Sequence, residues 1–298
     1  MTHANWKAQP ERGSLLLIKM LLWVALHLGR RVSRFWLYPI TAYFLIAARR
    51  PRLASRLYLR RVLQREPTWL EQARHFHCFS SVILDRVFLL SGRSQVFDIK
   101  IHNKEVLFDI VRSGRGCLLF GSHLGSFEVM RATACDFDIN VKVLMYREQN
   151  QQITAVLDAL NPAIANSVIP LGQNNSMLMA NEFVQSGGVL GILCDRTDDS
   201  DKVTACDFLG GKVELPAGAI ILAAAMKVPV VMMFGLYRGG NRYDIYFELL
   251  DEVIELPRQT RPQQIQYWMQ RYADKLQHYV LQAPYNWFNF YDYWHEQD

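Results

Sequence analysis

The sequence has few cysteines and no paired cysteine motif. Five cysteines lie scattered along 298 residues, and no Cys-x-x-Cys pair occurs. This pattern excludes a disulfide scaffold and a zinc ribbon and suits a reducing cytosolic setting. No window of about 20 apolar residues is free of charge, which argues against a polytopic membrane protein. Half of the residues are hydrophobic, so the chain can build one large α/β domain or two smaller ones.

Acidic residues are almost absent from the first 66 residues, which hold 13 Lys and Arg against two Glu, a net charge of +11. The rest of the chain holds 20 basic and 26 acidic residues, a net charge of −6. The basic segment also contains two apolar stretches, 14–29 and 35–48, each followed by arginines. Apolar stretches rimmed by Arg, with Trp and Tyr near their ends, are typical of a bilayer interface facing anionic headgroups. The alternative is a pair of core helices with a solvated arginine face.

The same basic residues are compatible in charge with nucleic acid, but they are interleaved with Leu, Trp and Phe, and no nucleic-acid-binding motif follows. We therefore expect a membrane surface as a partner and no nucleic acid. The predicted organisation is a membrane-associating helical segment over 1–66, spanning or lying on the bilayer, and a catalytic α/β domain over 67–298.

From residue 96 onward, β-rich runs alternate with helical ones, which predicts an α/β fold with a mixed, mostly parallel sheet flanked by helices. Before it, residues 53–90 predict helix broken at Pro67. The expected strands are 96–101, 117–122, 141–145, 189–194, 228–234 and 243–249. The expected helices are 103–112, 127–134, 152–160, 176–185, 217–226 and 262–282.

The segment 114–128, GRGCLLFGSHLGSFE, is the most informative part of the sequence. His123 follows a buried strand directly, at the edge where open α/β sheets place their sites. Gly125 lets the chain turn, and Ser126 is a good N-cap for the next helix. Glu128 in the first helical turn can fold back onto the imidazole, and a carboxylate on Nδ1 makes Nε2 a better base. His123 and Glu128 are therefore the candidate catalytic residues.

No G-x-S-x-G nucleophile elbow is present. The pair thus indicates an activated substrate hydroxyl rather than a covalent intermediate, although a His five residues before a Glu is most often structural. Arg147 and Asp195 each follow a strand and are candidate substrate-binding residues, with a surface charge and a helix cap or ion pair as the respective alternatives. The acidic run at 195–201 lacks the Gly and Glu of a calcium loop, and we expect no metal.

GSHLGSFE resembles the His-x4-Asp/Glu block of the glycerolipid acyltransferase superfamily, and in detail that of the bacterial lipid A late acyltransferases. Further segments resemble this family in the same order along the chain. They are Tyr146-Arg147, GILCDR at 191–196, CDFLGGKVELPAG at 206–218 and NWFNFY at 286–291. Several motifs in the right order are far more specific than the His and Glu alone.

This resemblance implies acyl transfer from an acyl thioester, on acyl carrier protein or coenzyme A, to a hydroxyl of a lipid or glycolipid. It implies a role in lipid A and lipopolysaccharide biosynthesis at the cytoplasmic face of the bacterial inner membrane, with no cofactor. His123 would be the base and Glu128 its orienter. Amides around Gly125 and Ser126 would stabilise the oxyanion, and Arg147 would hold a phosphate or the oxyanion.

Two departures from the family pattern leave the acceptor open. Ser126-Phe127 stands where the family block usually has Asn-Trp, and the segment LNPAIANSVIPLG lacks an Arg that lipid A enzymes often carry. The missing cation removes one potential phosphate clamp. The rival functions are an acyl-thioester hydrolase, which uses water in place of the alcohol, and a lipid-binding protein without catalysis.

Overall fold

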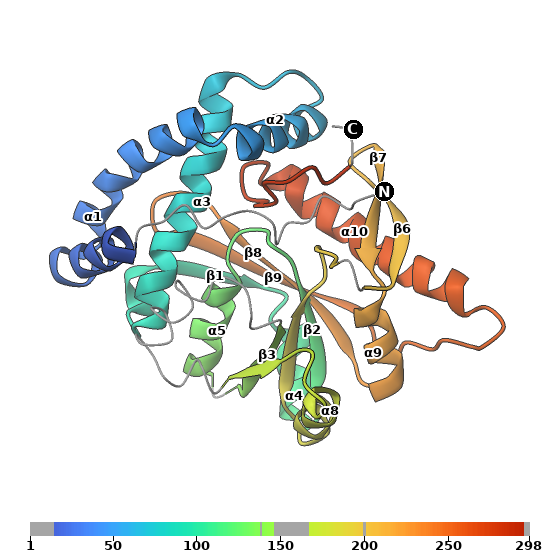
Figure 1. The fold of residues 1–298 in the computed structure, drawn as a ribbon. Helices are drawn as coiled ribbons and strands as arrows, with labels where there is room; N and C mark the ends of the chain where they lie inside the picture. The colour runs from blue at the N-terminus through green and yellow to red at the C-terminus, as the bar shows by residue number, and fades with distance from the viewer. Residues whose placement is uncertain (1–14, 138, 146–166, 199–200, 295–298) are drawn as a thin grey trace.

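The computed structural model describes residues 15–137, 139–145, 167–198 and 201–294, and a seven-stranded sheet forms its centre (Figure 1). The strands lie in the order β1-β9-β8-β2-β5-β3-β4. Every neighbouring pair is parallel except β8 and β9, which are antiparallel. The predicted α/β class with a mixed, mostly parallel sheet is therefore confirmed.

The strands of this sheet are β1 Asp98–His102, β2 Cys117–Gly121, β3 Val141–Met145, β4 Val168–Pro170, β5 Val189–Leu193, β8 Val230–Tyr237 and β9 Arg242–Asp251. All but β4 were predicted, with ends that agree within three residues. With only three residues, β4 is too short to show an alternating pattern.

A separate hairpin, β6 Val203–Phe208 and β7 Gly211–Pro216, was not predicted. Its two-residue turn consists of Leu209 and Gly210, both with positive φ (48° and 73°). Positive φ at both positions matches the right-handed twist of the flanking strands, but the preferred residues there are Asn and Gly. Because Leu stands at position 209, the turn gives no clear signal in the sequence.

The helices are α1 Leu15–Ala47, α2 Arg49–Leu63, α3 Trp69–Leu90, α4 Glu105–Arg112, α5 Phe127–Asp136, α8 Ser176–Gln185, α9 Gly218–Met226 and α10 Arg261–Gln282. The predicted break at Pro67 is confirmed, because Thr68 and Glu71 form a capping box that starts α3. The predicted helix over 152–160 lies outside the described residues.

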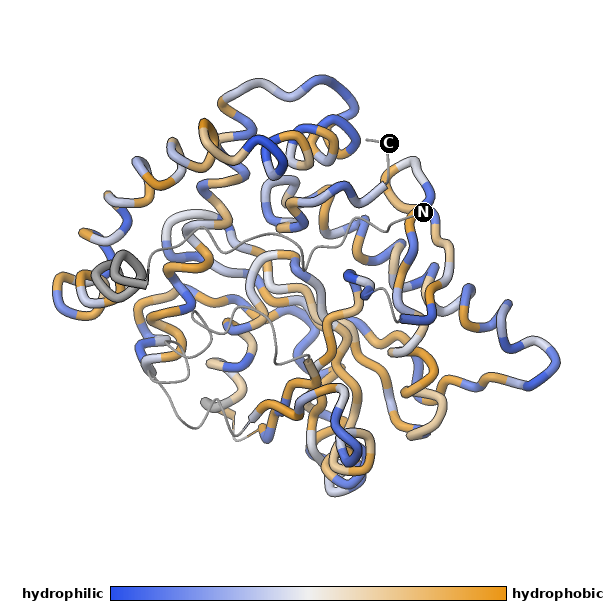
Figure 2. The backbone as a smooth tube through the Cα atoms, in the orientation of Figure 1, coloured by the Kyte–Doolittle hydropathy of each residue, from blue (hydrophilic) through white to orange (hydrophobic). Residues whose placement is uncertain are grey.

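Helices cover both faces of the sheet, and Figure 2 shows hydrophobic positions along the strands between them. The side chains of β2 alternate between the two sides, as strand geometry requires. Leu118 and Phe120 pack in one buried cluster with residues of α8, α9 and α10. Cys117 and Leu119 pack in a second cluster with residues of α3, α4 and α5. The result is a three-layer body.

The N-terminal helices lie against this body at its edge (Figure 1). Helix α1 is kinked at Gly29, where φ is 80°. In the described part of the chain, no helix combines the length and hydropathy needed to cross a membrane. Tyr58 and Leu59 on the inner face of α2 belong to the same buried cluster as Leu118 of β2. The domain boundary at residue 66 stays a prediction.

Candidate active site

Two neighbouring parallel strands bring His123 and Asp195 together. Gly121, the last residue of β2, is in register with Leu193, the last residue of β5. His123 and Asp195 each lie two residues beyond these strand ends, so they meet at the carboxyl edge of the sheet. His123 Nδ1 lies 2.8 Å from Asp195 Oδ1, and the His123 amide donates to Asp195 Oδ2 at 2.9 Å.

The Asp195 carboxylate is fully buried and surrounded by donors. Trp287 Nε1 donates to Oδ2 at 3.0 Å, and Asn289 Nδ2 donates to the same oxygen at 3.1 Å. Tyr293 Oη donates to the Asp195 backbone carbonyl at 2.9 Å. Burial alone would raise the pKa of Asp195, but the His123 contacts and the Arg196 charge hold it at about 2. Asp195 is therefore ionised at neutral pH.

The imidazole is held in the form that a general base requires. Because Asp195 is ionised, the contact with its Oδ1 places the His123 proton on Nδ1 and leaves the Nε2 lone pair open. Burial and the nearby Arg196 lower the pKa of His123, while Asp195 opposes them. The ring is thus neutral near pH 7, and its side chain keeps 26% of its surface exposed. Such a base can take a proton from a hydroxyl that reaches Nε2.

The loop after His123 is fixed by its own backbone. The Gly125 amide donates to Asn286 O and the Ser126 amide to Gly235 O, both at 2.8 Å. Gly125 has φ +67°, and a Cβ there would lie 1.9 Å from the Gly235 carbonyl oxygen. No other residue fits at position 125 without moving β8.

A C-terminal segment, residues 286–293, packs between the His123 loop and helices α2 and α3. Its Phe288 amide donates to the His123 carbonyl at 2.9 Å. His75 of α3 holds the segment in turn, since its Nε2 lies 2.9 Å from the Trp287 carbonyl and its Nδ1 lies 2.9 Å from Ser55 Oγ. Burial lowers the pKa of His75 to about 4. His75 is therefore a neutral, doubly bonded structural residue.

The structure differs from the prediction for Glu128. The expected Nδ1 partner, Glu128, points from the first turn of α5 toward α3, where its Oε1 lies 2.8 Å from Arg86 Nε. Asp195 takes that place because β5 lies beside β2, an adjacency that the sequence does not reveal. The charge of Glu128 still acts on His123 and raises its pKa, though less than Asp195 does.

The predicted substrate-binding residues divide into three groups. Asp195 lies in the site, as the partner of His123. Gly125 and Ser126 also lie there, but their amides already donate to backbone carbonyls of the fold. An oxyanion at this site would therefore need other hydrogen-bond donors. Buried Ser126 Oγ has no hydrogen-bond partner among the described residues. Arg147 lies outside the described residues.

Several residues of the site were not singled out from the sequence. Arg196 donates to Asn289 Oδ1 at 2.7 Å and to the Phe288 carbonyl at 3.0 Å, joining the β5 end to the C-terminal segment. The two asparagines in NWFNFY were the available signal, because polar side chains that alternate with aromatics in a buried tail need buried partners.

Fold and geometry together define an α/β protein with a histidine held by a buried carboxylate at the carboxyl edge of its sheet. The bacterial lipid A biosynthesis acyltransferase family matches residues 86–296, which include both strands and the C-terminal segment. The chain belongs to this family of acyltransferases, which act on lipid A-like acceptors. No curated protein matched the chain in a sequence comparison.

Proposed function

We propose that the chain moves a fatty acyl group from an acyl thioester to a hydroxyl of a lipid A-like glycolipid, with His123 as general base. The hydrogen bond from His123 to the buried Asp195 carboxylate carries this proposal. It fixes the tautomer and ring orientation, so that Nε2 is the basic nitrogen of a partly exposed side chain. Glu128, held by Arg86, adds a second negative charge that favours the imidazolium formed during reaction.

The proposed step moves one proton and one acyl group. His123 Nε2 takes the hydroxyl proton as the acceptor oxygen attacks the thioester carbonyl carbon, and the carbonyl oxygen becomes an oxyanion. Collapse of this intermediate breaks the carbon–sulfur bond, and the imidazolium returns the proton to the leaving thiolate. The oxyanion needs preorganised donors. The first amides of α5, which have no intrahelical partner, are our candidates.

We further propose that the reaction takes place at the cytoplasmic face of a bacterial inner membrane. The donor would be acyl carrier protein or coenzyme A. The basic N-terminal segment supports this setting, since its positive charge suits anionic lipids and an acidic donor.

Intact-lipid mass spectra test the proposal in cells that express wild-type protein or His123→Ala. A lipid heavier by one acyl chain, present only with wild type, would identify both acceptor and chain length. If purified wild-type protein consumes acyl thioester and yields only free fatty acid, the chain is a hydrolase. If it consumes none with the lipid acceptor present, the transfer proposal fails.

A further inference from the structure

The outer face of α1 carries an apolar stripe that no described part of the chain covers. Beyond the kink at Gly29, Ser33, Leu37 and Thr41 recur every four residues and are buried toward the body. The opposite face exposes large apolar side chains at helical spacing. They are Val32, Phe35, Trp36, Tyr43 and Ile46, with Phe35 70% and Ile46 76% exposed. Figure 2 shows the hydrophobic character of α1 at the periphery of the molecule.

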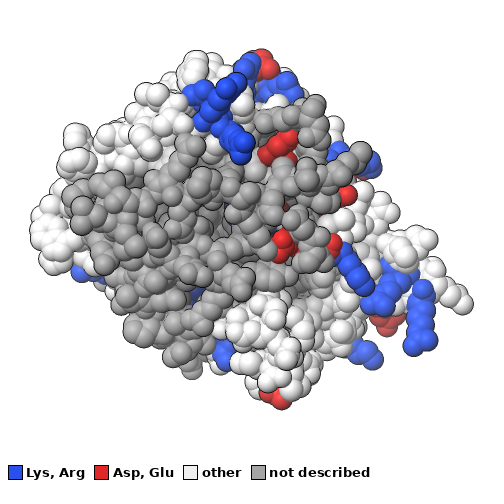
Figure 3. All heavy atoms as spheres, viewed as in Figure 1, with Lys and Arg blue, Asp and Glu red and all other residues white. Residues whose placement is uncertain are grey.

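Cations bracket this stripe at both ends. Arg31 precedes it, Arg49 and Arg50 follow it, and all three are exposed. Between Arg34 and Arg49 the helix has no charged residue. Figure 3 shows Lys and Arg side chains gathered over α2, beside the uncharged surface of α1. An apolar stripe with aromatic residues and flanking arginines matches the boundary between acyl chains and anionic headgroups.

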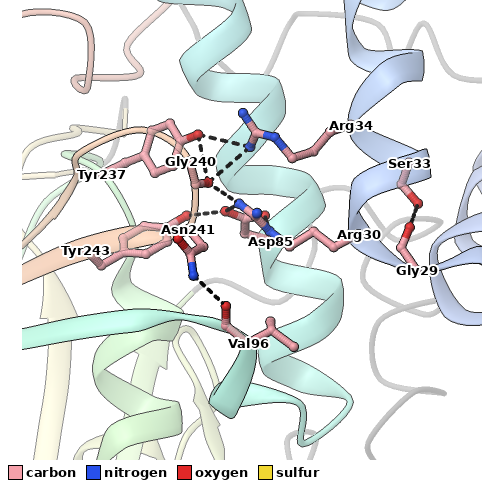
Figure 4. A network of polar contacts seen from close by, with 10 residues as sticks. All are labelled: Gly29, Arg30, Ser33, Arg34, Asp85, Val96, Tyr237, Gly240, Asn241 and Tyr243. Carbon is pink, nitrogen blue, oxygen red and sulfur yellow. Dashed lines mark hydrogen bonds and ion pairs between the residues drawn. The ribbon is translucent and has the colours of Figure 1, made fainter.

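A buried polar network fixes α1 to the body (Figure 4). Arg30 Nε and Nη2 donate to the two oxygens of Asp85, at 2.7 and 2.8 Å, and the carboxylate is fully buried. Tyr243 Oη donates to Asp85 Oδ2 at 2.9 Å. Arg30 also binds the Gly240 carbonyl, and Arg34 donates to Tyr237 Oη at 3.0 Å. Swinging α1 away from the body would leave Asp85 buried without its cation, which is costly.

We propose that the Arg30–Ala47 half of α1 lies in the plane of an anionic bilayer while it stays docked on α3. Val32, Phe35, Trp36, Tyr43 and Ile46 enter the acyl region, and Arg31, Arg49 and Arg50 contact lipid phosphates. A nucleic acid or an acidic protein surface offers no partner for so many exposed apolar side chains. The inference rests on the proposed function only in naming the membrane as the place where the enzyme works.

Vesicle flotation of the full-length protein tests the surface. Vesicles of phosphatidylcholine with a quarter phosphatidylglycerol serve as the probe, and pure phosphatidylcholine vesicles serve as the uncharged comparison. Phe35→Asp and Ile46→Asp should each weaken binding at least about tenfold, because a charge replaces an inserted side chain. The matched control is Leu281→Asp, on the half-exposed surface of α10, which should bind like wild type.

Depth measurements test the orientation. Spin labels attached at positions 35 and 46, through the substitutions Phe35→Cys and Ile46→Cys in a background with Cys78→Ser and Cys135→Ser, report how deeply each position lies. An in-plane helix gives the same depth at both positions within a few ångström. A spanning helix separates them by about 16 Å, since eleven residues rise 1.5 Å each. Unequal depths of that size would overturn the in-plane orientation.

Two other results would also overturn the inference. Wild-type binding by both Asp variants would show that the stripe does not touch lipid. A wild-type dimer that Phe35→Asp dissociates, without vesicle binding, would assign the stripe to a second copy of the chain. A failure of the proposed function is distinguishable, because it would appear as absent thioester consumption by wild type while flotation and depth results stand.

Discussion

The surroundings of Asp195 and the outer face of α1 differ in how far the fold itself supplies contacts for their side chains. Around Asp195, every carboxylate oxygen accepts a hydrogen bond, and the donors come from distant parts of the chain. On α1, Phe35 and Ile46 keep most of their surface in solvent. A buried charge persists only when the fold satisfies it. Large apolar side chains left exposed in a row favour a partner beyond the described part of the chain.

Histidines show the same contrast within the body. His75 is fully buried and bonded through both ring nitrogens. His123 is bonded through Nδ1 to Asp195, and part of its ring is exposed. A histidine with one nitrogen fixed and the other accessible can move a proton, whereas a histidine with both nitrogens bonded within the fold supports structure.

The largest effect should come from His123→Ala. Removing the base should lower the rate of acyl transfer at least about 10²-fold. Folding should be preserved, because the Asp195 donors Trp287 and Asn289 remain. Thioester consumption and product formation measure the rate, and circular dichroism checks the fold. A folded variant that retains more than about a tenth of the wild-type rate would show that His123 is not the base.

Asp195→Asn should have the next largest effect and lower the rate of acyl transfer by about 10²-fold. The amide keeps the shape but has lost the charge that holds the proton on Nδ1 and stabilises the imidazolium. Glu128→Gln is the matched comparison, and we expect a loss of only about tenfold, because Glu128 acts on His123 through its charge without a hydrogen bond. If kcat falls more in Glu128→Gln than in Asp195→Asn, then Glu128 is the principal orienter, as the sequence predicted.

Trp287→Phe should lower the rate of acyl transfer by a smaller factor and shift the pH dependence of that rate. Losing the indole N–H leaves the Asp195 carboxylate less stabilised, so it holds the His123 proton more strongly and raises the His123 pKa. The rate requires neutral His123, so the acid limb of the pH–rate profile should move to higher pH, and activity should fall more at about pH 6 than at about pH 8. Tyr293→Phe is the control, because Tyr293 donates to the Asp195 backbone. If the acid limb of the pH–rate profile does not move in Trp287→Phe, the indole contributes only packing at this position.

Much of the fold was predictable because it depends on local patterns. The buried run at Cys117–Gly121 and the turn at Gly125 placed His123 correctly at a strand end. The pairing with Asp195 was not predictable, because it follows from β5 lying beside β2, and strand order is a property of the whole sheet. Trp287 and Asn289 lie 92 and 94 positions from Asp195 in the sequence. No spacing rule connects such residues.

Substitutions in ion pairs far from His123 should have the smallest effects on catalysis. Their effect on the free energy of unfolding should depend on how deeply the pair is buried. Arg30→Ala leaves the fully buried Asp85 without its cation and should lower the free energy of unfolding by about 3 kcal/mol. Arg115→Ala breaks a pair with Glu252 in which both side chains are 52% exposed, and should cost between about 0 and 1 kcal/mol. Urea unfolding of the full chain measures both.

Arg30→Met combined with Asp85→Leu should recover most of the loss in unfolding free energy, because it removes both charges together. Equal losses in the two single variants would mean that α1 is held by its apolar contacts with α3 rather than by this network.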